Sequence, residues 1–196
     1  MQSAIGLRGK LGIKKLAAPG PGLMWKARNL KHVLPGTLRH AVAKTLGMNH
    51  MLGRLRIVLT QADGRKVNYG VVSCNLVTTA FCEFMVDQLI AETTVWGDFK
   101  FHDSGVGVTG ANITDTDIET TDGEARSTGT QVESSSVIYE SVGTIAYTTS
   151  KAITEHGLFS QATGTTLMDR HTFSAINVVN GDSIQFTYDL TCTAGG

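Results

Sequence analysis

The chain has 196 residues, of which 41% are apolar, 17% are charged and 22 are glycine. This length suits one compact domain with a proper core, and the low charge favours short strands and turns over long surface helices. Cys74, Cys82 and Cys192 have no CxxC spacing, which excludes a disulfide framework and a zinc signature, so we expect small buried thiols in a reducing cytoplasm. No run approaches the ~20 apolar residues of a membrane span, and the first residues lack the apolar core of a signal peptide, so no membrane partner is expected.

The net charge of zero hides an asymmetry along the chain. Residues 1–62 contain eleven Lys or Arg and no acid, whereas residues 63–196 contain six Lys or Arg and seventeen acids. The two parts therefore carry charges of +11 and −11. A basic N-terminal part of this kind is typical of an arm that interacts with a partner rather than of a uniform fold.

Residues 1–53 are predicted to form that arm, and residues 54–196 a folded domain. The arm shows only broken helical spacing, and "AAPGPGLMWK" contains two of the three prolines and two glycines, which end any helix there. A short helix is expected in "PGTLRHAVAKTLGM", with Thr37 as its N-cap. The apolar face of that helix would hold Leu38, Ala41, Val42 and Leu46.

Apolar side chains recur between the basic residues of the arm, which disordered tails avoid. DNA phosphates would need only the positive charge, whereas an acidic protein surface would also bury the apolar groups. The sequence therefore favours a protein partner over nucleic acid. The residues expected to bind it are Arg8, Lys10, Lys14, Lys15, Leu23, Met24, Trp25, Lys26, Arg28, Leu30, Lys31 and Leu34.

In the domain that follows, "RLRIVLTQ" and "KVNYGVVS" alternate around the turn "ADGR" and predict a β-hairpin. The segment "TTAFCEFMVDQLIAETT" predicts one helix, capped by Thr78 or Thr79, with Phe81 and Phe84 on its apolar face. The remainder, from "WGDFKFHDSG" to "SIQFTYDLTCT", consists of β-prone runs between turn residues. Seven or eight short strands predict a mainly β, antiparallel sandwich or barrel with one packed helix.

Two loop motifs are weak signals of ligand binding. "GVGVTG" fits G-x-G-x-x-G, but no apolar helix follows to meet a pyrophosphate, so we expect a glycine-rich turn at a strand end. "DTDIETTDGE" resembles a calcium loop, but Thr120 stands where the loop needs glycine and the flanking helices are missing. A solvated acidic loop is expected at 115–124, with a weak cation site as the alternative, and no cofactor or metal is predicted.

Histidines and charged residues of the second half are the remaining candidates for chemistry. They show no paired metal-ligand spacing, and "GLFSQ" is no nucleophile elbow, so no catalytic site is predicted. Glu155 and His156 are expected at a strand end beside a turn at Gly157, with a hydrolytic or carbohydrate-binding site as the rival interpretation. Arg170 is expected to form a surface ion pair with Asp169. The full set is His102, Asp103, Glu155, His156, Asp169, Arg170 and His171.

Three segments resemble a widespread type of tailed-bacteriophage virion protein: "NLVTTAFCEFMVDQL", "FKFHDSGVGVTGANITDTDIET" and "KAITEHGLFSQATGTTLMDRHTFSAINVVNGDSIQFTYDLT". The resemblance covers residues 75–193 and does not extend clearly over the arm. It implies a small, jelly-roll-like β-sandwich with a structural role in the particle. It also implies that the chain is not an enzyme and has no catalytic residues.

The resulting expectation is a capsid cement or decoration protein, assembled into the virion in the host cytoplasm. Its extended N-terminal arm would bind the major capsid protein, and copies of the chain would pair as a homo-oligomer, a dimer or a trimer. One alternative is a tail, neck or fibre-adaptor protein of the virion. The alternative of another class is a nucleic-acid-binding protein that uses the basic arm.

Overall fold

Nine strands and two helices make up the part of the chain that the computed structural model describes, which is residues 20–46, 48, 50–90, 98–164 and 166–193. In chain order they are α1 (Leu23–Thr45), β1 (His50–Thr60), β2 (Lys66–Leu76), α2 (Thr79–Leu89), β3 (Phe101–Gly105), β4 (Ser127–Thr128), β5 (Thr130–Ser135), β6 (Ile138–Ala146), β7 (Lys151–Phe159), β8 (Leu167–Val178) and β9 (Ser183–Thr193).

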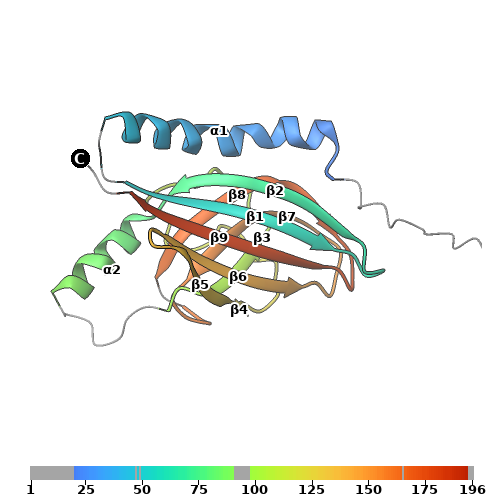
Figure 1. Cartoon of the computed structure of the whole chain (residues 1–196). Coiled ribbons are helices and arrows are strands. Elements are labelled where there is room, and N and C mark those ends of the chain that lie inside the picture. Colours follow the sequence, from blue (N-terminus) through green and yellow to red (C-terminus); the bar gives the residue numbers. More distant parts are fainter. Residues whose placement is uncertain (1–19, 47, 49, 91–97, 165, 194–196) are drawn as a thin grey trace, which may run out of the picture.

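The strands form two antiparallel sheets that face each other (Figure 1). One sheet has the order β2-β1-β9-β6-β5, and the other has the order β4-β3-β7-β8. The predicted mainly β, antiparallel architecture is confirmed, and the two sheets are consistent with the predicted β-sandwich. A jelly-roll connection of the strands stays a prediction.

The core lies between the two sheets and follows from alternation along the strands. In β1, Leu55, Ile57 and Leu59 are buried while the residues between them are more exposed. The partner strand β9 supplies Ile184 and Phe186 to the same core. The predicted hairpin is confirmed as β1 and β2, which pair on either side of a turn where Gly64 adopts a φ of +81°.

The helix predicted within residues 54–196 is confirmed as α2, which begins directly after the predicted cap residue Thr78. The Thr78 hydroxyl accepts a hydrogen bond of 3.2 Å from the Phe81 backbone N–H, which satisfies one of the free donors of the first turn. Phe81 and Phe84 face inward and pack edge to face against Phe99. The outward face of α2 is left to solvent, and Cys82 lies there.

The expectation of an extended arm is wrong for the described part of the arm. Leu23–Thr45 is one helix of 23 residues that continues through Pro35. Thr37 is inside this helix rather than at its start, and its hydroxyl donates to the Val33 carbonyl at 2.8 Å. The strand β1 already begins at His50, so the expected boundary after residue 53 falls within β1.

The helix α1 persists because it packs on the open edges of both sheets. β2 and β8 are the edge strands on this side, and α1 lies along them (Figure 1). The Asn29 amide joins the two edges, since its Nδ2 donates to the Val72 carbonyl at 2.7 Å and its Oδ1 accepts from the Ser174 N–H at 2.9 Å. At Gly36 an added Cβ would overlap the Cys74 carbonyl, so only glycine permits this approach. The helix therefore protects two edges that would otherwise offer unpaired backbone groups.

Candidate functional site

Several segments that stood out in the sequence meet at the side chain of Glu155. This residue lies within β7 and has no exposed surface. Its Oε1 accepts hydrogen bonds from the backbone N–H groups of Gly107 at 2.9 Å and Thr120 at 2.8 Å. Its Oε2 accepts from the Glu119 N–H at 3.0 Å and from the Arg170 Nε at 2.7 Å. One carboxylate thus fixes the glycine-rich turn, the acidic loop and β8 to one another.

Arg170 is the cation at the centre of this cluster. Its guanidinium is only 3% exposed and reaches Asp115 at 3.0 Å and Glu119 at 3.3 Å in addition to Glu155. Burial opposes the charged form, but the hydrogen bonds that Arg170 donates to Asp115 and Glu155 outweigh it, so the pKa of Arg170 is raised. The predicted surface pair of Arg170 with Asp169 is wrong. The loop of residues 106–124 covers the outer face of the sheet that contains β7 and β8, so residues 167–173 of β8 are buried on both faces and Arg170 does not lie on the surface.

The first two glycines of "GVGVTG", Gly105 and Gly107, are explained by the Glu155 carboxylate. An added Cβ at Gly105 or Gly107 would overlap Glu155 Oε1, so both positions exclude a larger side chain. The turn follows directly on the end of β3, which confirms the predicted glycine-rich turn at a strand end. Its backbone N–H at Gly107 points at the protein's own carboxylate, the place that a phosphate would occupy in a nucleotide site.

Four of the five acids of the 115–124 loop are paired with cations of the chain, and the fifth, Asp122, accepts hydrogen bonds from the Ser104 hydroxyl and the Glu124 N–H. Besides the two that contact Arg170, Asp117 lies 3.5 Å from Arg126 and Glu124 lies 2.8 Å from Lys151. The hydrogen bond from Lys151 is the largest cause that lowers the pKa of Glu124 to about 2. Within the described ranges, no group of three or more His, Cys, Asp or Glu side chains is placed to hold a metal ion.

The three candidate histidines converge, but inside the core. His102 Nδ1 lies 2.9 Å from His156 Nε2, and His102 Nε2 lies 2.9 Å from the Ser141 hydroxyl. His171, paired in register with His156, lies 3.1 Å from Asp169. All three imidazoles have no exposed surface. Burial lowers the pKa of His102 to about 3 and that of His156 well below its ordinary value, so both are neutral at pH 7.

Glu155 and His156 therefore lie in the middle of β7, and their predicted position at a strand end is wrong. Adjacent residues of a strand point to opposite faces of a sheet. Glu155 points outward to the covering loop, whereas His156 points inward and stacks on Phe186 at a ring distance of 4.6 Å. The two side chains cannot act on one substrate, and a solute reaches neither without opening the fold.

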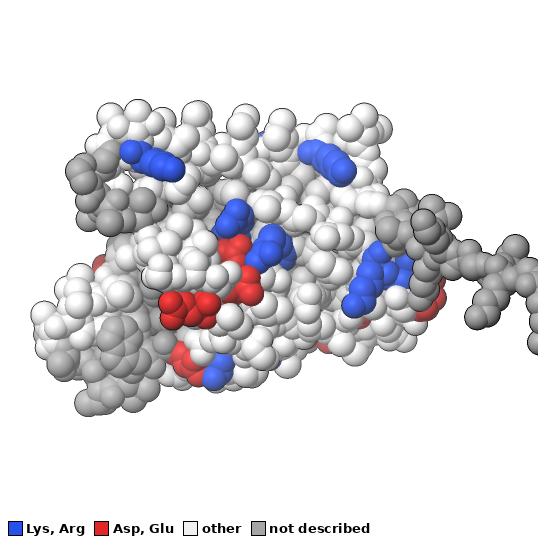
Figure 2. Space-filling view, in the orientation of Figure 1, with Lys and Arg blue, Asp and Glu red and all other residues white. Residues whose placement is uncertain are grey.

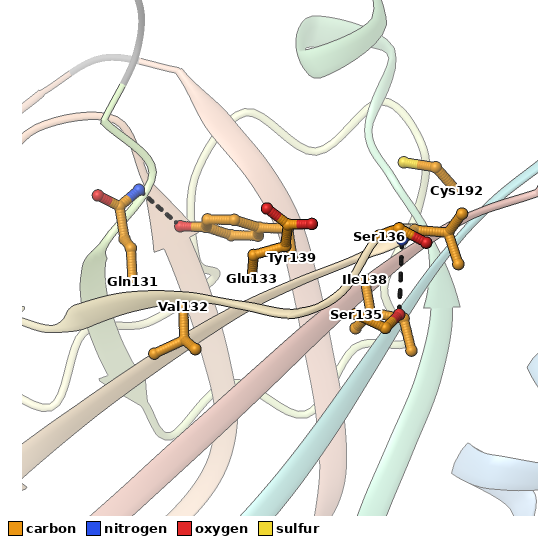
Figure 3. A pocket seen from close by; sticks show the side chains of 9 residues that line it. Gln131, Val132, Glu133, Ser135, Ser136, Ile138, Tyr139 and Cys192 are labelled. Carbon is orange, nitrogen blue, oxygen red and sulfur yellow. Dashed lines mark hydrogen bonds between the residues drawn. The ribbon is translucent and has the colours of Figure 1, made fainter.

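A surface concavity of about 520 Å³ lies at the β5–β6 hairpin (Figure 3). Its lining includes Gln131, whose amide donates to the Tyr139 hydroxyl at 2.9 Å, and the exposed Cys192. Glu133 is its charged residue. The lining offers no paired nucleophile and base, so we find no arrangement there that supports a reaction. The expectation of buried cysteines holds for Cys74 and is wrong for Cys82 and Cys192, which are exposed.

Contacts within this chain do not explain the apolar residues on the outer face of α1. An apolar stripe runs along it at 50–83% exposure, while the buried residues of α1 are Asn29 and Gly36. The helix contains five basic residues and no acid, and Figure 2 shows basic side chains on the ridge that α1 forms, with uncharged atoms between them. The stripe consists of Leu23, Met24, Leu30, Leu34, Leu38 and Val42. The basic residues are Lys26, Arg28, Lys31, Arg39 and Lys44.

The predicted partner-binding residues divide into three groups. Trp25 faces inward, where its indole N–H donates to the Ala175 carbonyl at 3.0 Å and its ring packs against Tyr69. Four of the others lie outside the described residues, namely Arg8, Lys10, Lys14 and Lys15. The rest are exposed on α1, namely Leu23, Met24, Lys26, Arg28, Leu30, Lys31 and Leu34. The sequence placed Leu38 and Val42 on one helical face but did not indicate that this face points to solvent.

No helix in the described ranges has both the length and the apolar character to cross a membrane. No family model, no curated protein and no solved structure matches the chain. The resemblance to tailed-bacteriophage virion proteins stays a prediction.

Proposed function

We propose that the chain is a structural, non-catalytic protein of a bacteriophage particle, a capsid cement protein with a jelly-roll-like sandwich. It binds the shell of the major capsid protein through the N-terminal part of α1, residues 23–31, and strengthens that shell. The assignment to a phage particle is based on the resemblance of residues 75–193. The choice of the binding surface is based on the exposed outer face of α1.

The exposed apolar stripe carries the proposal. A soluble monomer rarely exposes a contiguous apolar patch larger than roughly a few hundred Å², and a patch above that size marks a surface that binds a protein or a membrane. Burying a Leu or Met side chain completely contributes about 1.5–3 kcal/mol. Leu23, Met24 and Leu30 are 83%, 72% and 55% exposed, so more than half of that contribution is still available at each of them.

The charges around the stripe indicate the character of the partner. Lys26, Arg28 and Lys31 flank the three apolar residues, and no acid lies between residues 1 and 62. An acidic surface with apolar anchors would satisfy both features, whereas DNA would pair with the cations and leave the leucines in water. Each single contact is small, so the stabilisation of a shell would come from many copies bound to one lattice.

A co-sedimentation assay tests the proposal against its alternatives. The full chain is mixed in turn with phage heads that lack it, with tails that lack it and with linear duplex DNA. We expect co-sedimentation with heads, and loss of it in the variant Leu23→Ser with Leu30→Ser and in the variant Lys26→Glu with Lys31→Glu. Val132→Ser is the matched control, because Val132 is also exposed, at 50%, but lies in β5.

Binding to tails instead of heads would replace the cement role with the tail or neck role. If the chain still binds DNA at about 0.2 M salt, and only the variant Lys26→Glu with Lys31→Glu loses this binding, the nucleic-acid role is favoured. Binding to heads that survives both α1 variants would overturn the proposed contact.

A further inference from the structure

The helix α2 presents a second exposed apolar face. Val86, Leu89 and Ile90, at its C-terminal end, are 56%, 78% and 58% exposed. Glu83 and Asp87 lie beside them, and the helix Thr79–Leu89 contains no basic residue. The inward face of α2 is occupied by its phenylalanines, so this outward face is not part of the domain core.

The C-terminal half of α1 has the matching character with the opposite charge. Leu34, Leu38 and Val42 follow one another at i, i+4 spacing and are 56%, 61% and 50% exposed. Arg39 and Lys44 are the charged residues of this half, and it contains no acid. The two acids of α2, Glu83 and Asp87, therefore complement the two cations of this half of α1.

We propose that α2 of one copy of this chain packs on the C-terminal half of α1 of a second copy. Cys82, Val86 and Ile90 form an i, i+4 ridge on α2, and Leu34, Leu38 and Val42 form an i, i+4 ridge on α1. Two such ridges interdigitate in the commonest mode of helix packing. An α2 of 11 residues is about 16 Å long, which is close to half the length of the 23-residue α1.

Charge selects this pairing over the symmetric ones. Two α1 helices would bring cations together, and two α2 helices would bring acids together, so both self-pairings are disfavoured. The pairing of α1 with α2 covers both exposed apolar faces with one kind of contact. It leaves residues 23–31 of α1 for the shell, so it goes beyond the proposed function and uses other residues.

The two faces belong to different sides of the molecule, because α1 lies along the β2 and β8 edges and α2 lies at one end of the sandwich (Figure 1). A contact between two different faces is heterologous, and its repetition gives a ring or an open chain of copies. A single helix pair is smaller than a standard stable interface. Association is therefore expected to depend strongly on concentration and to become tight only where many copies are held together.

Sedimentation velocity on the purified full chain, with no shell or other partner present, tests the pairing. The wild type is expected to shift from monomer to larger species as its concentration rises from micromolar to millimolar. The variant Arg39→Glu with Lys44→Glu has two acidic faces, and the variant Glu83→Lys with Asp87→Lys has two basic faces. Each is expected to associate at least tenfold more weakly than the wild type.

An equimolar mixture of these two variants is the decisive sample. Each acidic face then meets a basic face on the other variant, so the mixture is expected to recover association to the wild-type level. Arg65→Glu with Lys66→Glu is the control for net charge, because it changes the charge equally at the β1–β2 turn and is expected to leave association unchanged. Circular dichroism checks that each variant is folded, and all the changed side chains lie at least partly exposed on the surface.

Three results would overturn the pairing: a wild type that stays monomeric at millimolar concentration, a mixture that associates no better than its components, or association that responds to α1 variants alone. None of these bears on shell binding, which is measured with heads and depends on residues 23–31. Failure of the cement role would likewise leave the self-association result standing.

Discussion

The buried histidines predict that the fold loses stability in mild acid. His102 and His156 are neutral in the folded chain, with pKa values lowered by burial, to about 3 in the case of His102. In the unfolded chain both return to an ordinary value near 6.5. Below that value the unfolded state binds more protons than the folded state, so the free energy of unfolding falls as the pH falls.

The magnitude follows from the same linkage. Between pH 7 and pH 5, each histidine whose folded pKa lies below this range lowers the free energy of unfolding by about 2 kcal/mol. His102 alone therefore lowers it by about 2 kcal/mol, and His156, whose pKa is also lowered by burial, adds to a loss that is a large share of the 5–15 kcal/mol typical of a domain. Burial raises the pKa of Asp103, which acts in the opposite sense, so a comparison of variants is needed to isolate the histidines.

Urea denaturation at pH 7, 6 and 5 measures this dependence. His102→Gln keeps a polar group near the Ser141 hydroxyl but removes one proton site, so the loss between pH 7 and pH 5 is expected to shrink by about 2 kcal/mol. Val132→Ser, at an exposed position of β5, is the control, because it removes no titratable group and is expected to keep the full loss. Equal stability of the wild type at pH 7 and pH 5, or an unchanged loss in His102→Gln, would refute the neutral histidine pair.

Three further changes test the packing that holds the loop and α1. Arg170→Met leaves the buried Glu155 without its cation and is expected to lower the free energy of unfolding by about 3–5 kcal/mol, measured by urea denaturation. Gly107→Ala forces a Cβ onto Glu155 Oε1 and is expected to cost about 1–3 kcal/mol, whereas Gly110→Ala, which has open space around it, changes stability little. Asn29→Ala removes the bridge between β2 and β8 and is expected to cost about 1–3 kcal/mol, with faster hydrogen exchange at the Ser174 amide, and an unchanged exchange rate there would contradict the bridge.

Features determined by neighbours in the sequence were predictable. The cap at Thr78, the turn with Gly64 and the alternation of β1 all depend on residues within a few positions. The helix α1 was not predictable in the same way, because Pro35 and Gly36 disfavour a helix locally. Gly36 is there because the helix touches the Cys74 carbonyl, a contact 38 positions away along the chain.

The buried cluster of Glu155 and Arg170 was also not predictable, because its contacts join residues that are distant in the sequence. Arg170 and Glu155 are 15 positions apart, and a chain of alternating strands gives no sign that both faces of β7 and β8 are covered. The loop of residues 106–124 covers this face, and it has no regular secondary structure. Its only indication in the sequence is the pair Gly105 and Gly107, which leave room for the Glu155 carboxylate. Two adjacent charged residues in a β-prone run suggest a surface because burial of a charge is costly, and only the complete set of partners offsets that cost here.

The position of this cluster also decides what the family resemblance can say about function. The segments with the resemblance contain Gly107, Glu119, Glu155 and Arg170, which contact one another inside the domain. Contacts within the domain account for those residues, without any binding partner. The outer face of α1, in contrast, lies outside residues 75–193 and contributes little to its own core. A partner is therefore to be sought through Leu30, Leu34 and their basic neighbours, and variants of Glu155 are expected to unfold the chain before they reveal anything about binding.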